Sequence, residues 1–282
     1  MPVQPVLDFS GTAQPLMPAD LDAALRTLEL DGIANLPLLW AVLTVESRGF
    51  GFLADRRPKV LFERHIFFRE TGGRFAATAP DLCAKTGGGY AGGAAEYDRI
   101  GRALALCRRS GLGDEPVLNS ASWGLGQIMG FNARSAGFSD ASAMVTAMSA
   151  SEGAQLTAMT GFMKSEGLDG RLKTRDWTGF ARRYNGPAYW KNAYDVKLKA
   201  AFDKFSSGVS RDLRARAAQG ALLFLGYQPG DPDGIVGQNT RRAIQAFRAD
   251  AGLGASTALD EGVFRAIMGK AGLTWSANAL PD

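Results

Sequence analysis

Apolar residues recur every three or four positions over most of the chain, a spacing that lines up one face of an α-helix. The first such stretch opens after Pro18, carries Leu21 and Leu25 on its apolar face, and stops at Gly32. The same spacing predicts further helices over residues 36–46, 96–109, 139–165 and 176–205. Alternating apolar and polar residues, which indicate a half-buried strand, are rare. The pattern therefore predicts a mainly α protein.

Two segments interrupt this helical pattern. Residues 53–95 have no sustained period, although the apolar run Val60–Phe62 is short enough to be a strand. The glycine-rich stretch Gly87–Gly93 predicts a loop. Later in the chain, closely spaced glycines in Ser120–Gly130 predict a turn that leads into a helix.

The C-terminal part of the chain has its own organisation. Residues 206–210 read Ser-Ser-Gly-Val-Ser, which predicts a linker. Beyond it, three helical stretches surround a turn-rich segment, Tyr227–Gly237. Thr240 is predicted to cap the second of these helices and Gly252 to end it. A three-helix module of this size lies near the lower limit for a domain with its own core.

The composition is that of an ordinary globular protein, with 282 residues, 46% hydrophobic and 21% charged. A chain of this length is typical of two domains. The net charge of +4 fits a polyanionic partner such as a cell wall, a nucleic acid or a membrane surface. No run of Lys and Arg forms a nucleic-acid-binding stripe, so no nucleic acid is expected as a partner.

The N-terminal residues 1–17 are rich in Pro, Gly, Ser and Thr and predict an extended leader. They lack the basic start and apolar stretch of a signal peptide, which predicts synthesis in the cytoplasm. The longest apolar run, Leu36–Val45, is far shorter than a membrane span, so no stable membrane anchoring is expected. Cys83 and Cys107 do not make a disulfide framework and are predicted to be free thiols.

The single histidine, His65, argues against several kinds of catalysis. Zinc hydrolases generally need two or three histidine ligands, and a Ser-His-Asp or Cys-His system would depend on this one residue. The chain also lacks glycine-rich nucleotide-binding motifs in a strand-to-helix context. No metal and no cofactor are therefore expected, and the chemistry is predicted to rest on carboxylates.

Glu46 is the first candidate catalytic carboxylate. It ends a predicted helix and shares a face with Leu39, Val42 and Leu43. Apolar neighbours disfavour the charged form of a carboxyl group, so this position suits a general acid that stays protonated near neutral pH. A solvated or ion-paired helix-terminal glutamate is the alternative interpretation.

Glu63 is the second candidate, because it follows the short apolar segment 60–62 and precedes Arg64 and His65. It is suited to activating water or to stabilising the positive charge that develops at an anomeric carbon. An ion pair with Arg64 or another base is the alternative. His65 either orients Glu63 or is a hydrogen-bonded polar residue without a catalytic role. Glu70 and Asp81 are weaker rivals for the second carboxylate.

Residues 211–270 resemble the peptidoglycan-binding type 1 domain. The resemblance is carried by Leu225-Gly226-Tyr227, Asp233-Gly234-Ile235-Val236-Gly237, Thr240, Ala243, Phe247 and Gly252-Leu253. The sequence departs from the usual helix glutamines where Arg248 follows Phe247. The resemblance implies a small three-helix domain that binds the cell wall.

Residues from about 20 to 205 resemble the N-acetylmuramidase domain of phage endolysins, within the lysozyme-like group. The motifs are Val45-Glu46-Ser47 with Gly49-Phe50-Gly51-Phe52, Leu61-Phe62-Glu63-Arg64-His65, Ser122-Trp123-Gly124-Leu125-Gly126-Gln127-Ile128-Met129-Gly130, and Arg183-Tyr184-Asn185-Gly186. The resemblance implies a lysozyme-like catalytic domain in which Ser122 and Gln127 line the substrate and Tyr184 and Asn185 face the cleft.

The two resemblances together predict a domain organisation and a function. The predicted parts are a leader (1–17), a catalytic domain (18–205), a linker (206–210), a peptidoglycan-binding domain (211–274) and a tail (275–282). The expected activity is cleavage of the β-1,4 bond between N-acetylmuramic acid and N-acetylglucosamine. Glu46 is expected to be the general acid, and Glu63 the general base or charge stabiliser. The expected partner is the glycan strand of peptidoglycan, and the expected state is a monomer.

The expected biological role is host lysis by a phage endolysin, which reaches the periplasm or cell wall after release by a holin. A bacterial autolysin is an alternative source. One alternative activity is that of a lytic transglycosylase, which leaves 1,6-anhydro-muramic ends. The other alternative is a non-catalytic wall-binding or phage structural protein. The combination of Glu46, Gln127 and Tyr184-Asn185 argues against the non-catalytic alternative.

Overall fold

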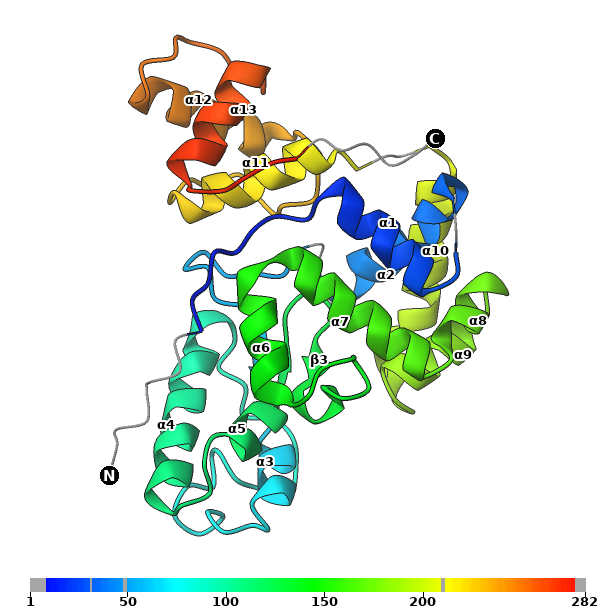
Figure 1. Cartoon of the computed structure of the whole chain (residues 1–282), viewed down its shortest axis with the longest axis vertical. Helices are drawn as coiled ribbons and strands as arrows, with labels where there is room; N and C mark the ends of the chain where they lie inside the picture. The colour runs from blue at the N-terminus through cyan, green and yellow to red at the C-terminus, as the bar shows by residue number, and fades with distance from the viewer. Residues whose placement is uncertain (1–8, 31, 48–49, 209–210, 277–282) are drawn as a thin grey trace.

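The computed structural model describes residues 9–30, 32–47, 50–208 and 211–276, apart from the side chains of Ile33, Glu46 and Ser47. The helices of the larger, N-terminal part are α1 (Pro18–Thr27), α2 (Leu36–Ser47), α3 (Arg64–Glu70), α4 (Glu96–Arg109), α5 (Glu115–Asn119), α6 (Ala141–Ala150), α7 (Glu152–Ser165), α8 (Leu168–Lys173), α9 (Trp177–Tyr184) and α10 (Tyr194–Ser206). The helices of the C-terminal part are α11 (Leu213–Phe224), α12 (Gln238–Asp250) and α13 (Glu261–Lys270). Figure 1 shows these last three grouped at one end of the molecule. The chain is mainly helical, as its sequence predicts.

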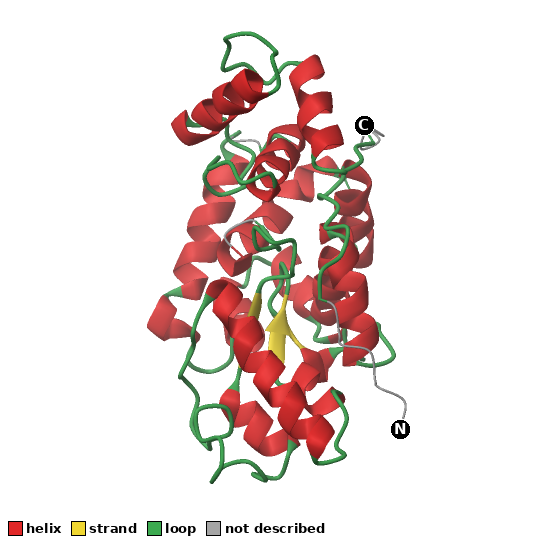
Figure 2. Ribbon diagram, turned by 90° about the vertical axis from the view of Figure 1, so that its left-hand side faces the viewer, coloured by secondary structure: helices red, strands yellow, loops and turns green. Residues whose placement is uncertain are grey.

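A small antiparallel sheet lies within the larger part. Its strands are β1 (Val60–Phe62), β2 (Ala121–Trp123) and β3 (Ile128–Met129), in the order β1-β2-β3. Leu61 pairs with Ser122, and Ser122 pairs with Met129. Figure 2 shows the sheet enclosed by helices. The sheet therefore joins two segments that are far apart in the sequence.

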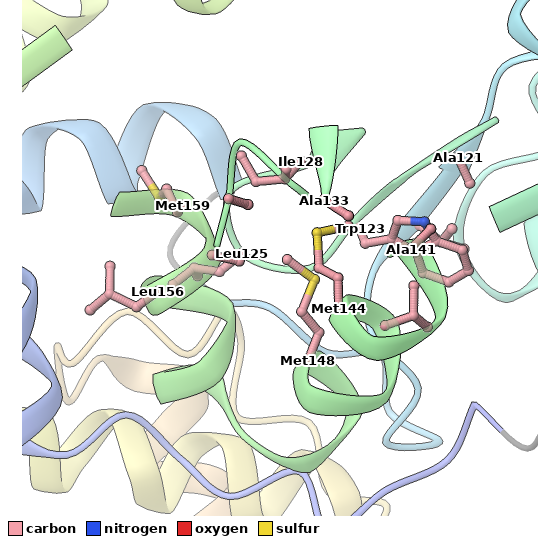
Figure 3. Packing of buried hydrophobic residues seen from close by; sticks show 14 of the residues in the cluster. Ala121, Trp123, Leu125, Ile128, Ala133, Ala141, Met144, Met148, Leu156 and Met159 are labelled. Atoms are coloured by element: carbon pink, nitrogen blue, oxygen red, sulfur yellow. The ribbon is translucent and has the colours of Figure 1, made fainter. Parts of the chain in front are cut away.

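The hydrophobic core of the larger part packs around this sheet. Trp123 is fully buried, and its indole N–H donates to the Leu118 carbonyl over 3.1 Å. Side chains from α6 and α7, including Met144, Met148 and Met159, pack against the hairpin formed by β2 and β3 (Figure 3). Because these residues belong to one continuous cluster, the hairpin is fixed by the core beneath it.

Several predicted elements agree with the structure and three do not. The predictions for 36–46, 60–62 and 96–109 match α2, β1 and α4. Residues 120–130 were predicted as a turn leading into a helix, which is wrong, because they form the β2–β3 hairpin. Gly124 and Gln127 in its turn have φ angles of 66° and 47°, which a right-handed helix does not allow.

The predicted helix over 139–165 is interrupted at Ser151, and the one over 176–205 between α9 and α10. Ser151 is extended, and its hydroxyl accepts the Ala154 N–H at the start of α7. It also forms a parallel bridge with Gln14. A distant segment therefore ends α6, and helical periodicity alone does not reveal that break.

Thr240 does not cap α12, because Gly237 occupies the N-cap position. Instead the buried Thr240 hydroxyl donates to the Pro229 carbonyl over 2.9 Å and accepts from Gln219 over 3.0 Å. Thr240 therefore ties α12 to α11 and to the turn-rich loop. The predicted end of the helix at Gly252 fits a φ of 68° there, a value that favours glycine.

The described part of the N-terminal segment, residues 9–17, packs against the larger part. Phe9, Ala13 and Leu16 are buried, and the Phe9 ring stacks on Trp123 at a centroid distance of 5.5 Å. Gly11 lies so close to Ser149 that an added Cβ would be 2.0 Å from its carbonyl oxygen. This segment contains no helix, and it completes the core. Residues 1–8 of the predicted leader lie outside the described residues.

The C-terminal helices enclose a separate hydrophobic cluster that includes Leu222, Ile244, Phe247, Phe264 and Ile267.

Cys83 and Cys107 are buried free thiols, and burial raises the pKa of Cys107 to about 11. Over the residues described, no helix is both long enough and apolar enough to cross a membrane.

Candidate active site

Helix α2 carries the first candidate carboxylate, Glu46, in its last turn. Leu39, Val42 and Leu43, the predicted apolar face of this helix, are all buried. In the sequence, Glu46 follows Val42 and Leu43 by about one helical turn. Its side chain lies outside the described part of the structure, and its role as general acid stays a prediction.

Glu63 directly follows β1 and occupies the N-cap position of α3. The Tyr90 hydroxyl lies 3.1 Å and 3.0 Å from its two carboxylate oxygens and donates to them. His65 Nδ1 lies 3.1 Å from Oε2, although it is not aligned for a hydrogen bond. The Glu63 side chain is 16% exposed. This carboxylate is therefore oriented by a phenol and still open to solvent.

The predicted alternative for Glu63 was an ion pair with Arg64 or a neighbouring base, and of these His65 lies at ion-pair distance. The Arg64 guanidinium instead donates to the carbonyls of Thr86 and Gly87, over 2.8 Å and 2.9 Å. Arg64 thus anchors the start of the glycine-rich loop that brings Tyr90 to Glu63. The orienting contact comes from a loop that the sequence analysis left without a role.

The other end of this loop is held by Glu96, a fully buried carboxylate at the start of α4. It accepts hydrogen bonds from the backbone N–H groups of Ala91 and Gly92 over 2.6 Å and 2.9 Å. It also accepts from Phe62 N–H at the end of β1 and from Arg99, which lies 2.7 Å away. One carboxylate therefore fixes both the strand before Glu63 and the loop that carries Tyr90.

The electrostatics of this cluster favour the charged form of Glu96 and the neutral form of Tyr90. Burial raises the pKa of Glu96, but hydrogen bonds from Gly92, Arg99 and Phe62 outweigh it, so the net pKa lies below its usual value. Burial, and then the negative charge of Glu63, raise the pKa of Tyr90. Tyr90 therefore stays a neutral phenol and can donate to Glu63 at neutral pH.

Ser122 and Gln127, two predicted substrate residues, face each other across the β2–β3 hairpin. The Ser122 hydroxyl donates to the Gln127 side-chain oxygen over 2.9 Å. The Gln127 amide donates to the Gly124 carbonyl over 2.9 Å. Gln127 is therefore partly committed to bracing the turn, and it remains half-buried at the edge of the site.

Tyr184 reaches the same turn from α9. Its hydroxyl donates to the Gly126 carbonyl over 2.8 Å, and its ring stacks on Phe180 at 5.6 Å. Asn185 is the residue after α9, and its backbone N–H donates to the Ala181 carbonyl. The structure thus gathers Ser122, Gln127 and Tyr184 at one hairpin. The strand pairing of β1 with β2 connects that hairpin to Glu63.

Two polar side chains of helix α7 accept hydrogen bonds from the backbone of these loops, and neither was predicted from the sequence. Gln155 is buried, accepts the Leu125 N–H over 2.7 Å and donates to the Met148 carbonyl over 2.9 Å. Glu152, one turn earlier, accepts the Gly51 N–H over 2.9 Å. The available signal was an acid and an amide on the apolar face of a predicted helix, where buried polar groups need partners.

The close packing around Gln155 explains a glycine of the motif that follows Glu46. A Cβ added to Gly51 would lie 1.8 Å from the Gln155 side-chain oxygen. Gln155 therefore sits between the segment that follows α2 and the β2–β3 turn.

Within the described ranges, no group of three His, Cys, Asp or Glu side chains is arranged to hold a metal ion.

Comparison with known proteins identifies the family of each part of the chain. Residues 35–206 match the N-acetylmuramidase family, and residues 211–267 match the peptidoglycan binding domain family. No curated protein sequence matches the chain. The crystal structure of the Burkholderia AP3 phage endolysin is similar, with 42% identity and a TM-score of 0.61. The similarity covers 69% of this chain and 73% of that one. The family match spans more than half of the chain, so the protein belongs to the N-acetylmuramidase family and is a glycoside hydrolase of peptidoglycan with a peptidoglycan-binding domain.

Proposed function

We propose that this protein is a phage endolysin that hydrolyses the β-1,4 bond between N-acetylmuramic acid and N-acetylglucosamine, with Glu46 as the general acid and Glu63 as the second carboxylate. The geometry of Glu63 carries the proposal. This carboxylate is solvent-accessible, is held at both oxygens by Tyr90, and follows a strand paired to the one that carries Ser122. A carboxylate that is already held in one orientation loses little conformational entropy when it meets the substrate.

In the proposed reaction, Glu46 donates a proton to the oxygen of the departing N-acetylglucosamine as the glycosidic bond breaks. Positive charge then develops at the anomeric carbon of N-acetylmuramic acid, and the charged Glu63 stabilises it. Water attacks that carbon, its hydroxyl group forms the new bond, and its remaining proton passes to a carboxylate. The products are a reducing-end N-acetylmuramic acid and a new N-acetylglucosamine end.

The surrounding side chains have supporting roles in this proposal. Ser122 and Gln127 shape the hairpin wall and offer polar atoms to sugar hydroxyl and N-acetyl groups. Tyr184 and Asn185 complete the wall from α9. The C-terminal domain binds peptidoglycan, and the protein acts as a monomer. The endolysin role is supported by similarity to the structure of a phage endolysin. In that role, a holin releases the protein from the cytoplasm to the periplasm or cell wall.

A digest of purified peptidoglycan, followed by mass spectrometry of the fragments, tests the assignment. The wild type is expected to release fragments that end in reducing N-acetylmuramic acid. Glu46→Gln is expected to abolish their release, and Glu63→Gln to slow it by about a hundredfold or more. Glu70→Gln is the matched control, because Glu70 lies on α3 near Glu63 but contacts Arg69 and Asn119.

Three results would contradict the proposal in different ways. Anhydro-muramic ends would make the protein a lytic transglycosylase. Full activity of Glu63→Gln would remove that residue from the mechanism. If a folded wild type released no fragments, the protein would be a wall-binding module.

A further inference from the structure

A buried ion pair joins the two domains. Arg216 lies on α11 of the peptidoglycan-binding domain, and Glu152 lies at the start of α7 in the N-acetylmuramidase domain. The Arg216 nitrogens lie 2.5 Å and 2.7 Å from the two Glu152 oxygens, and both side chains are at most 2% exposed. Both charges are withdrawn from water, so this two-point pairing requires a fixed arrangement of the domains.

The Glu152 carboxylate also holds two segments of its own domain. One oxygen accepts the Gly51 N–H over 2.9 Å, and the other accepts the Leu16 N–H over 3.3 Å. Gly51 belongs to the segment that follows α2, whose last turn carries Glu46. The same carboxylate thus connects the C-terminal domain to Gly51, which packs against Gln155 and the β2–β3 turn.

Aromatic packing strengthens this connection. Phe50 and Phe52, on either side of Gly51, are buried and pack against Phe224 at the end of α11. The Arg216 guanidinium lies over the Phe50 ring, 5.6 Å from its centroid. A Cβ added to Gly220 of α11 would lie 3.0 Å from the Phe50 ring. Helix α11 therefore touches the segment 50–52 through both its backbone and its side chains.

Further contacts extend the interface away from α11. The Arg56 guanidinium donates to the Ala271 carbonyl over 2.5 Å and lies over the Phe224 ring. The Gln14 side-chain oxygen accepts hydrogen bonds from the Thr274 N–H and hydroxyl. Figure 1 shows α11 as the C-terminal helix that lies beside the N-terminal segment. The peptidoglycan-binding domain is packed on the catalytic domain over several segments.

We infer that the C-terminal domain is a working part of the catalytic site, in which Arg216 acts through Glu152 as a positioning residue for segment 50–52, which packs against Gln155 and the β2–β3 turn. This inference rests on the proposed function and on the place of the β2–β3 turn in its site. Without Arg216, Glu152 becomes a buried charge without its counter-ion, and the carboxylate that holds Gly51 must rearrange. Displacements of about 1 Å next to a catalytic group cost up to about a hundredfold in rate.

The inference is tested with full-length variants on a soluble substrate. The substrate is a set of short glycan chains from peptidoglycan, freed of peptide cross-links, so that adhesion to an insoluble wall does not limit the rate. Arg216→Met is expected to lower kcat by about tenfold or more. Its KM and its pelleting with insoluble peptidoglycan are expected to stay near wild type.

Arg214→Met is the matched control. Arg214 lies on the same helix, but its side chain is 42% exposed and pairs with Glu261 inside the C-terminal domain. Its removal is expected to leave kcat unchanged. A fall in kcat with both variants would overturn the specific role of Arg216.

A rescue variant separates positioning from misfolding. In the double variant Glu152→Gln with Arg216→Met, no buried charge is left unpaired, and the amide oxygen at position 152 can still accept the Gly51 N–H. The double variant is expected to regain much of the kcat lost in Arg216→Met. If Arg216→Met does not fold, as judged by circular dichroism and thermal melting, the same test uses the double variant and Phe224→Ala.

Two further outcomes would overturn the inference. If Arg216→Met keeps wild-type kcat on soluble glycans and loses activity only on intact cell walls, the C-terminal domain is a tether. If the wild type and Arg214→Met are also inactive on soluble glycans, the proposed function fails, and the inference fails with it. These results are distinguishable, because only the second affects the wild type.

Discussion

In each of the two domains, a buried glutamine side chain fixes a turn, but the two turns carry different residues. In the catalytic domain, buried Gln155 accepts the Leu125 N–H over 2.7 Å and so fixes the β2–β3 turn. In the C-terminal domain, buried Gln219 accepts the Gly234 N–H over 2.8 Å and donates to the Ile235 carbonyl. Each glutamine has an amide donor and acceptor that satisfy backbone groups of a glycine-containing turn.

The difference lies in what the fixed loops carry. In the catalytic domain, fixed loops present Glu63, Tyr90 and Gln127 at the proposed site. In the C-terminal domain, the loop held by Gln219 packs against α12 through Thr240. An apolar groove of about 380 Å³ lies elsewhere in that domain, and it is lined by Leu225, Tyr227, Phe247, Asp250, Ala251, Ala266 and Lys270. A buried glutamine bonded to a loop backbone thus shows that the loop has a defined conformation. Whether the loop takes part in catalysis depends on the side chains that it presents.

The largest expected effect concerns Glu96, whose carboxylate holds the loop of Tyr90. Glu96→Ala leaves the buried Arg99 without its ion-pair partner and removes the acceptor of the Ala91 and Gly92 N–H groups. The free energy of unfolding is expected to fall by about 3–5 kcal/mol, measured by chemical denaturation. The control Glu261→Ala, at an exposed pair of the C-terminal domain, is expected to stay near wild type. Equal losses in the two variants would contradict this assignment.

A pair of glutamine variants sharpens the comparison between domains. Gln155→Ala and Gln219→Ala each leave a buried backbone N–H without its acceptor, so each is expected to cost about 1–3 kcal/mol of unfolding free energy. Gln155→Ala is also expected to lower kcat on soluble glycans, because it loosens the β2–β3 turn. Gln219→Ala is expected to keep kcat within about twofold of wild type, since its loop lies outside the proposed site. A larger loss of kcat in Gln219→Ala would contradict this division of roles.

Tyr90→Phe tests the presentation of Glu63 with a smaller change. The variant keeps the ring and removes the hydroxyl that donates to both Glu63 oxygens. We expect kcat to fall by about tenfold, which corresponds to about 1.4 kcal/mol, with little change in melting temperature. Tyr227→Phe is the control in the other domain, where it removes a hydroxyl that donates to Asp250. Unchanged kcat in Tyr90→Phe would mean that Glu63 does not depend on this contact.

The smallest expected effect is a pH dependence of stability from Glu96. Its pKa in the folded protein lies below the ordinary value of 4.5, because its hydrogen bonds outweigh burial. The stabilisation by charged Glu96 is therefore complete above about pH 4.5. It is lost as the pH falls through the lower pKa that Glu96 has in the folded protein. The difference in melting temperature between wild type and Glu96→Gln is expected to narrow below that pH. A constant difference down to about pH 3 would refute this linkage.

The parts of the fold that were predictable are those fixed by local sequence. Helix α4 was predicted over its full length, 96–109, because its apolar residues repeat at helical spacing. The hairpin over 121–129 was missed, because its strands are too short to show a period and pair with a segment some sixty residues earlier. The interruption at Ser151 was missed for the same reason, since Gln14 is the partner that stabilises it.

The site divides in the same way. The sequence drew attention to Glu46, Glu63, Ser122, Gln127, Tyr184 and Asn185, and the structure brings Ser122, Gln127 and Tyr184 to one hairpin. Tyr90 and Glu96 had no predicted role, because their importance comes from contacts with residues on other elements. A tyrosine in a glycine-rich loop is unremarkable until the loop is folded over a carboxylate.

The sequence by itself determined the helical class and the family, and it predicts two carboxylates for glycoside cleavage. Helical hydrogen bonds and family motifs involve residues close together in the chain, so a linear pattern can reveal them. Only the tertiary structure decided that Tyr90 orients Glu63, that α7 supports the site, and that Arg216 reaches Glu152 across the domain boundary. These contacts pair residues distant in sequence, and burial makes each such pairing specific, because an unpaired polar group or charge inside the protein is costly.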